Sequence, residues 1–422
     1  MNKKPIILIV SLLGGLSLSS CESIKPIETV KISVWSEPKE QEVIEKVIKQ
    51  WNENHIRKHQ IEIEFSSKHA NYYNEEIIDE LPSLFYATDS SIPNLIKNDL
   101  IYKIEEKKAK EIIENNVYVA QKGFEYKDCI YGYPTTIDNG YFLWYNKYFL
   151  NEKEASSLES ILKIAKDNNA SFYFDVANGW YVNSFFMSPQ ACGLQSINYL
   201  KDKDNKVYYN ASWDDENGLE VAEYIQSVLS PYYYDNTLSI GSGMGPNDKF
   251  AHRKTIAVVS GIWSEKDFQT SLREDLAACK LPSFNINGKS YQMASFGSSK
   301  GYFVNNKKSE KEIQTANLLA QLLNSKDAQI LRYQLTQSIP TRLDVIDNKK
   351  FKEISSAGAF ALAQQSKYAS VQYQTVENRY WSVGTKIGKA LIENLDNNET
   401  LTEFLKQQMD ELRTPKEEII YD

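Results

Sequence analysis

The hydrophobic pattern of the chain switches repeatedly between the two-residue period of a strand and the 3.6-residue period of a helix. Residues 30–35 alternate, residues 40–54 have apolar side chains at helical spacing, and residues 61–65 alternate again. Further strand patterns lie at 81–87, 141–145, 171–176, 255–260 and 301–305. Further helical patterns lie at 157–166, 216–229, 310–323, 384–395 and 399–412. This interleaving predicts an α/β fold with mainly parallel sheets, and only helices after residue 325.

The composition supports a large folded body and argues against a nucleic-acid partner. The 422 residues suffice for about two or three domains, and 42% hydrophobic with 25% charged residues is typical of globular proteins. The formal net charge is −8 and the basic residues form no long cluster, so we expect no nucleic-acid binding. Aromatic residues make up 12% of the chain and include 27 Tyr, which is more than a core requires.

The first 20 residues are typical of an export signal. Two lysines precede an apolar stretch over residues 6–18 that is too short to span a bilayer as a helix. The Leu-Ser-Ser-Cys segment that ends at Cys21 resembles the bacterial lipobox, whose cysteine is lipidated. We therefore expect a signal peptide at 1–20, a lipid anchor and tether at 21–29, and a protein held at the extracellular or periplasmic face of the cell membrane. The alternative is an ordinary thiol beside an ordinary cleavage site.

No catalytic or metal-binding motif is complete in the sequence. His55 and His59 have the i, i+4 spacing of zinc ligands, but the glutamate of HExxH is missing and the pair falls at a polar helix end. The glycine-rich segment 241–246 lacks the GK(S/T) of a phosphate loop, and no GxSxG motif occurs. The cysteines after residue 21 are three and widely spaced, which predicts neither a disulfide framework nor a metal site. We therefore expect no cofactor and no metal.

Three segments carry recognisable motifs. Residues 81–104 form an apolar strand that ends in aromatic-Ala-x-Asp and leads into a short helix. Residues 131–147 contain Y-x-x-P followed by YNK, and residues 250–263 end in Gly-Ile-Trp and are followed by KLPSF at 280–284. In this order and spacing they resemble the periplasmic and lipoprotein sugar-binding components of ABC importers, in particular the maltodextrin-binding proteins. Lys254 departs from the pattern, because this family usually has Gly there.

The resemblance implies a periplasmic-binding-protein fold of type II, in which two hinged α/β lobes close on a ligand. The implied crossings lie near 135–139, 293–297 and 340–343. The implied first lobe comprises residues 30–136 and 298–341, and the second comprises residues 137–297 and 342–422 with the C-terminal helices. The implied function is that of a monomeric, non-catalytic receptor, which binds a maltodextrin-like oligosaccharide and delivers it to the permease subunits of an ABC importer.

A sugar ring has apolar C–H faces and a rim of hydroxyls, so a sugar site needs aromatic rings beside polar groups. Segment matching puts Tyr86 in the place of the family's first-lobe stacking aromatic and Asp89 in that of its hydroxyl-binding Asp. The acidic residue at the crossing corresponds to Asp138 or Asn139, because the alignment has a one-residue insertion there. Glu37, just after the first strand, is a further candidate.

The second lobe is expected to supply most of the aromatic platforms. Its segment 178–181 matches the family's E-P-aromatic-aromatic motif, so Trp180 and Tyr181 would stack on sugar rings and Asn178 replaces an acid. Trp263 and Trp381 match the two remaining platforms. The other tryptophans within strand, helix or cap patterns are assigned to packing: Trp51, Trp144 and Trp213.

Two alternatives to a sugar receptor stay open at this point. A secreted glycoside-acting enzyme would use Asp89, Asp138 and other carboxylates as acid and base, although the sequence does not select a pair. A surface adhesin would bind no small ligand. The sugar also stays open, because Ser90 and Asn178 stand where the maltodextrin binders have charged groups.

Overall fold

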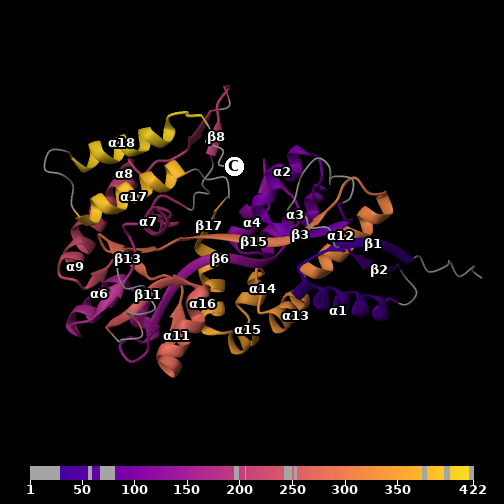
Figure 1. Cartoon of the computed structure of the whole chain (residues 1–422), viewed down its shortest axis with the longest axis horizontal. Helices are drawn as coiled ribbons and strands as arrows, with labels where there is room; N and C mark the ends of the chain where they lie inside the picture. Colours follow the sequence, from indigo (N-terminus) through magenta and orange to yellow (C-terminus); the bar gives the residue numbers. More distant parts are fainter. Residues whose placement is uncertain are drawn as a thin grey trace, which may run out of the picture.

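The computed structural model describes residues 29–55, 59–66, 81–193, 199–204, 206–241, 250, 254–372, 378–393 and 400–417. The predicted signal peptide, Cys21 and the predicted tether up to residue 28 lie outside these residues. Figure 1 shows two groups of helices, one around β1 to β3 and one around β11, with β6 and β15 running from one group to the other. Within the described residues, no helix combines the length and the apolar character needed to cross a membrane.

The strands of both groups join in one mixed sheet, which has eleven strands among the described residues. Its main path is β10-β7-β11-β6-β15-β3-β1-β2. The bounds along that path are β10 Leu238–Ser239, β7 Ser171–Tyr173, β11 Thr255–Gly261, β6 Tyr133–Asn146, β15 Ser295–Val304, β3 Leu84–Thr88, β1 Thr29–Trp35 and β2 Gln60–Phe65. Three short strands pair off the path, namely β12 Leu276–Cys279 and β16 Ile339–Pro340 with β6, and β17 Ala369–Val371 with β15.

Strand β6 is a single extended segment that serves both groups. Its first half pairs with β15 and β16, and its second half pairs with β11 and β12. The alternation at 141–145 predicted only the second half, because the first half contains Pro134 and two threonines and lacks a strand-like hydrophobic pattern. The predicted strand at 301–305 likewise covers only the end of β15.

The expectation of mainly parallel sheets is wrong for the centre of the molecule. The outer pairs β1–β2, β1–β3, β7–β10 and β7–β11 are parallel. Both crossing strands are antiparallel to each other and to β3 or β11. The expectation of helices alone after residue 325 is also wrong, since β16 and β17 lie there. These two strands have two or three residues, too few to show a period.

The helices have the caps and apolar faces that their sequences predict. Helix α1, Pro38–Asn54, begins with Pro in its first turn and buries Val43, Ile44, Val47 and Ile48. Helices α12, Glu310–Asn324, and α18, Leu401–Arg413, each begin with a capping box. The predicted helix at 216–229 is α8, Glu216–Tyr224, which continues through a π-turn into α9, Ser230–Tyr234.

The remaining helices are α2 Ile92–Lys97, α3 Glu106–Asn115, α4 Tyr118–Gly123, α5 Glu152–Ala155, α6 Leu158–Asp167, α7 Gly179–Phe186, α11 Glu265–Leu272, α13 Lys326–Thr336, α14 Leu343–Ile346, α15 Lys349–Ile354, α16 Ala357–Gln365 and α17 Asn378–Glu393. The remaining strands form three hairpins: β4 Glu125–Tyr126 with β5 Cys129–Ile130, β8 Tyr199–Lys201 with β9 Val207–Tyr209, and β13 Ser283–Ile286 with β14 Lys289–Gln292.

Three buried clusters of apolar side chains form the core. One lies between β1 to β3 and helices α1 and α12. A second joins the end of β6, β7 and β11 to α6, α7, α8, α17 and α18. The third lies under the crossing strands, where it includes Ile137, Trp144 and Leu362. Trp144 and Trp213 are buried as expected, and the lobe boundaries predicted from the sequence stay a prediction.

Candidate ligand-binding site

Three charged side chains meet where the chain leaves β1 and passes the middle of the two crossing strands. Lys300 Nζ on β15 lies 3.1 Å from Glu37 Oε1 and 2.8 Å from Asp138 Oδ1. Glu37 occupies the N-cap position of α1, just after the carboxyl end of β1. Because ligands of open α/β sheets bind at the carboxyl ends of the parallel strands, this charged triad lies where a ligand is expected.

A β-bulge decides which of the two predicted crossing residues joins the triad. Ile137 pairs with Ser299 and Asn139 pairs with Ser298, so Asp138 is the extra residue of β6. The bulge leaves the Asp138 side chain exposed and aims it at Lys300. The Asn139 side chain instead accepts a hydrogen bond from the Gly140 N–H at 2.9 Å. The one-residue insertion noted in the sequence falls at this bulge.

The electrostatics of the site favour the ionised forms of Glu37 and Lys300. Partial burial alone would raise the pKa of Glu37, but the ammonium groups of Lys300 and Lys39 hold it below its ordinary value. Partial burial alone would lower the pKa of Lys300, but Asp138 and Glu37 together keep it above its ordinary value. The Glu37 carboxylate and the Lys300 ammonium therefore carry their charges at neutral pH.

Asp89 lies behind the triad, inside the first group. It begins the turn after β3, is fully buried, and its Oδ2 accepts hydrogen bonds from the Ser299 N–H at 2.8 Å and the Ser299 hydroxyl at 3.2 Å. Its Oδ1 has no partner among the described residues. Burial raises the pKa of Asp89 to about 7, although the hydrogen bonds from Ser299 oppose the shift.

Tyr86 is also an interior residue. Its ring is 2% exposed and packs against Tyr302 with 5.0 Å between ring centroids, and its hydroxyl lies 2.6 Å from that of Thr136. Strand β3 has β1 on one side and β15 on the other, and its residues from Leu84 to Ala87 are buried. Tyr86 and Asp89 therefore present no open face to a ligand in this structure, which differs from the exposed placement that the resemblance implies.

The predicted aromatic residues of the second group do come together. Trp180 lies 5.2 Å from Tyr181 and 6.1 Å from Trp263 between ring centroids, and the planes of the two tryptophans differ by only 22°. Trp263 follows β11 in a 3-10 turn and is 54% exposed. Its ring folds over Gly261, where a Cβ would collide with it. The ring of Trp180 thus contacts the rings of both Tyr181 and Trp263, and these three residues are called the aromatic wall.

Asn178 and Trp381, the other two candidates of this group, lie next to the aromatic wall. The Asn178 side chain caps α7 by accepting a hydrogen bond from the Trp180 N–H at 2.8 Å. It therefore holds the turn that carries Trp180. Trp381, in the first turn of α17, is half-buried and packs edge-on against Phe296 of β15 with 5.4 Å between centroids.

The crossing strands connect the aromatic wall to the charged triad. Trp180 Nε1 donates a hydrogen bond to Gln372 Oε1 at 3.1 Å, and the Gln372 N–H donates to the Gly297 carbonyl at 3.0 Å. Gly297 and Lys300 lie three residues apart on β15, which corresponds to about 10 Å along a strand. Sequence reasoning missed Lys300 and Gln372. The sequence does contain a signal for Lys300, because it is the only charged residue within β15.

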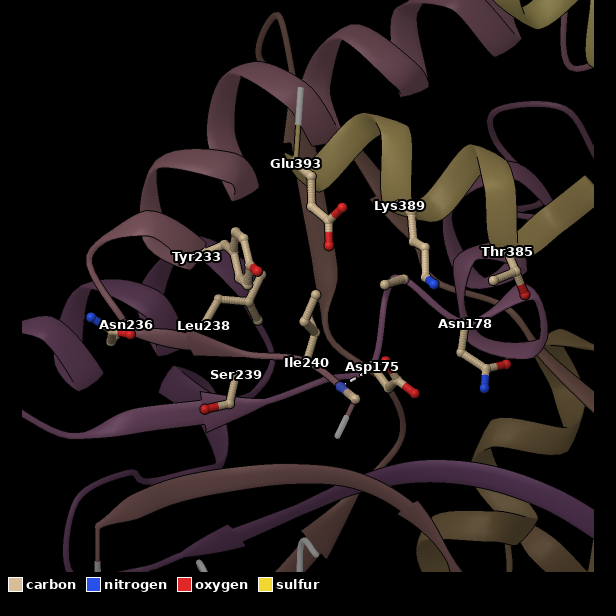
Figure 2. Close-up of a pocket in the computed structure, with 12 residues that line it drawn as sticks. Asp175, Asn178, Tyr233, Asn236, Leu238, Ser239, Ile240, Thr385, Lys389 and Glu393 are labelled. Carbon is tan, nitrogen blue, oxygen red and sulfur yellow. Dashed lines mark hydrogen bonds between the residues drawn. The ribbon is translucent and has the colours of Figure 1, made fainter. Parts of the chain in front are cut away.

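A separate polar pocket of about 520 Å³ opens in the second group between β7, β10 and α17. Figure 2 shows Asp175, Lys389 and Glu393 on its walls. Burial raises the pKa of Asp175, whose carboxylate accepts a hydrogen bond from the Gly241 N–H at 2.8 Å. Among the predicted site residues, the lining of this pocket includes Asn178 alone. The pocket therefore adjoins the aromatic wall at the N-cap of α7, and the three residues of the wall do not line it.

Comparisons with known proteins agree with this architecture. Residues 46–359 match the family model described as bacterial extracellular solute-binding protein. The ligand-free maltodextrin-binding protein MalE1 of L. casei is 15% identical, with a TM-score of 0.66 over 92% of this chain and 99% of its own. The extracellular solute-binding protein of Staphylococcus aureus in complex with maltose is 17% identical, with a TM-score of 0.66 over 90% and 96%.

The maltose-binding protein MalE of Listeria monocytogenes, in complex with maltose, is 16% identical and has a TM-score of 0.66 over 92% of this chain and 97% of its own. At these identities the likeness establishes the fold alone. The comparison with curated proteins found no match. The predicted periplasmic-binding-protein fold is confirmed.

Proposed function

The chain belongs to the family of bacterial extracellular solute-binding proteins, which serve ABC importers, and we propose that the solute it binds is an oligosaccharide of the maltodextrin type. The observation that carries this proposal is the aromatic wall beside the charged triad. Trp263 and Trp180 offer flat apolar faces for the C–H faces of sugar rings, and the triad offers carboxylate oxygens for their hydroxyls.

The geometry of the aromatic wall favours a ligand with more than one ring. A ring held between two parallel planes needs about 7 Å between them, because atoms in contact lie about 3.5 Å apart on each side. The centroids of Trp180 and Trp263 lie only 6.1 Å apart with nearly parallel planes, so no ring fits between them. A ligand instead lies along the wall, with successive rings on successive side chains, and extends from the wall towards the triad.

The proposed function also includes attachment to the membrane and delivery of the ligand to a permease. We propose that residues 1–20 are removed on export, that Cys21 is lipidated, and that residues 21–29 tether the folded body to the membrane. The two lobes close on the ligand, and the closed receptor delivers it to the permease subunits. Structural relatives with maltose or maltotetraose bound support the ligand class without identifying the ligand of this chain.

A thermal-shift screen tests the ligand class. The purified protein is heated with maltose, maltotetraose, glucose, amino acids and short peptides. A ligand at a hundred times its dissociation constant adds about 2.7 kcal/mol of stability, so a binder raises the unfolding temperature measurably. Stabilisation by peptides or amino acids with none by any glycan would reject the sugar assignment and leave the receptor fold intact.

Membership of this family argues against the alternative of a secreted glycoside-acting enzyme, because this family binds solutes and catalyses no reaction. The positions of its candidate carboxylates agree, since Asp89 is fully buried and Asp138 is held in an ion pair with Lys300. Incubation with maltotetraose is therefore expected to yield quenching of tryptophan fluorescence without product, and repeated turnover would contradict the proposal.

A further inference from the structure

Lys300 occupies an unusual place for a lysine, in the middle of a sheet strand that connects the two groups. It pairs with Thr136 of β6 on one side and with Thr88 of β3 on the other. Its side chain is 23% exposed, and its two partners are 29% and 37% exposed. The charged triad is thus open to solvent on one side and held by three separate elements on the other.

The closest contacts of Lys300 use one oxygen of each carboxylate. Glu37 uses Oε1 and Asp138 uses Oδ1, and Oε2 of Glu37 lies 3.4 Å from the exposed Lys39. A carboxylate has lone pairs on both oxygens and can accept from several donors at once. The second oxygens, Oε2 and Oδ2, can therefore accept hydrogen bonds from two hydroxyls of one ring or of neighbouring rings.

Without the ammonium, the two carboxylates would face each other across the space that Lys300 fills. Like charges at short range oppose ionisation and repel the side chains. A carboxylate that moves or takes up a proton becomes a poorer acceptor for a hydroxyl. Asp89 is buried behind β15 and bonded to Ser299, so it does not replace either carboxylate.

We infer that Lys300 is the positioning and selectivity residue of this site: it holds Glu37 and Asp138 as paired acceptors for the hydroxyls of a neutral sugar and offsets their charge against cationic sugars. This inference rests on the proposed function. It differs from a purely structural role, because removal of the ammonium changes the preference between neutral and cationic ligands and not only the affinity.

Calorimetric titration of wild-type protein and Lys300→Met with maltotetraose and with the tetramer of glucosamine tests the inference. We expect Lys300→Met to weaken maltotetraose binding by about ten-fold or more, because the hydrogen bonds to charged acceptors are impaired. We expect the ratio of the two affinities to move by about ten-fold towards the glucosamine tetramer, because two uncompensated carboxylates attract its ammonium groups.

Two variants control for folding and for general charge effects. Lys300→Arg keeps the cation and should restore most of the maltotetraose affinity. Lys46→Met removes an exposed lysine of α1 that pairs with Glu42 outside the triad, and it should change neither affinity by more than about two-fold, since exposed pairs contribute little. Thermal unfolding of each variant shows that it is folded, and Lys300→Gln substitutes for Lys300→Met if the latter is not.

The outcomes separate this inference from the proposed function. Wild-type protein that does not bind maltotetraose contradicts the proposed ligand and the inference together. Wild-type protein that binds, with Lys300→Met changing both affinities equally or not at all, overturns only the role of Lys300.

Discussion

The side chains of the candidate site differ in exposure. Some have a solvent-exposed face that a ligand can contact, and others are buried with their polar groups hydrogen-bonded inside the protein. Trp263 leaves more than half of its surface to solvent and lies beside Trp180. Tyr86 and Asp89, which the same segment matching selected, are buried and hydrogen-bonded to strands β6 and β15. Residues that segment matching selected in the same way thus differ in role, because a buried side chain such as that of Tyr86 or Asp89 has no face for a ligand to contact.

The first residue-scale prediction concerns Trp263. Trp263→Ala should weaken maltotetraose binding by about 1–3 kcal/mol, roughly ten- to a hundred-fold, because the ligand loses a desolvated aromatic contact. The unfolding temperature should change little, since the ring is largely exposed. Fluorescence titration measures the affinity. Tyr148→Ala removes another exposed ring, 72% accessible and outside the aromatic wall, and should leave binding unchanged; equal losses in both variants would contradict the prediction.

The second residue-scale prediction concerns the buried carboxyl of Asp89, whose folded pKa of about 7 lies above its ordinary value of 3.8. Between these pH values the folded state binds more protons than the unfolded state, so stability falls as pH rises, by up to about 1.4 kcal/mol per pH unit. Asp89→Asn removes the titrating group, and its amide oxygen can still accept from Ser299.

Urea unfolding at pH 5 and pH 8 measures this difference. Wild-type protein should lose more stability between the two pH values than Asp89→Asn does. Asp99→Asn serves as the control, because that carboxylate is exposed and pairs with Lys307, and burial does not dominate its pKa. Equal pH dependence of wild-type protein and Asp89→Asn would show that the carboxyl is ionised throughout.

At the scale of elements, the strand and helix ends determine where the site groups lie. The carboxyl end of β1 leads into Glu37, the turn after β11 carries Trp263, and the start of α7 carries Trp180. Only Asp138 depends on an irregularity within a strand, the β-bulge of β6. Bulges re-aim a side chain without ending the strand, so the crossing can continue into the second group while one carboxylate leaves the sheet.

The element-scale prediction concerns the cap of α7. Asn178→Ala should lower stability by about 1 kcal/mol, because the Trp180 N–H loses its partner. Asn178→Asp keeps an N-cap acceptor and should retain the stability of the wild-type protein. Thermal unfolding measures both. An alanine variant as stable as wild-type protein, with reduced maltotetraose affinity, would instead assign Asn178 to direct ligand contact.

At the scale of the whole molecule, the groups that a ligand needs belong to different parts of the fold. The charged triad includes Glu37 from the first group, and the aromatic wall lies in the second group. The two are joined through β6 and β15, along which Figure 1 shows the groups side by side. A ligand that contacts both therefore favours the conformations in which they approach most closely.

The whole-molecule prediction is that maltotetraose makes the protein more compact. Solution scattering with and without saturating maltotetraose should give a smaller radius of gyration with the sugar, as expected of hinge closure between two lobes. Alanine at the same concentration serves as the control and should have no effect. A radius of gyration that is unchanged while calorimetry detects binding would contradict closure and favour a preformed site.

The sequence by itself determined the features that depend on short stretches of chain. The helical period predicted α1, α6, α12 and α18 to within a few residues, the alternation predicted β1 and β2, and a strand pattern at 255–260 predicted β11. The motif order indicated the family and matched Trp180, Trp263 and either Asp138 or Asn139 to its ligand site, while Glu37 was a candidate from its place after the first strand. These site assignments stay predictions. The predictions of elements and of the family succeed because caps, periods and motifs involve residues that are near neighbours along the chain.

Only the tertiary structure decided which of these residues meet. Lys300 and Glu37 are separated by 263 positions, and their contact depends on the register of β15 between β3 and β6. The antiparallel direction of the crossing strands, the bulge at Asp138 and the burial of Tyr86 depend on the same pairing. Strand pairing is a long-range interaction, and a shift of one residue moves every side chain to the other face of the sheet. No local pattern carries that information.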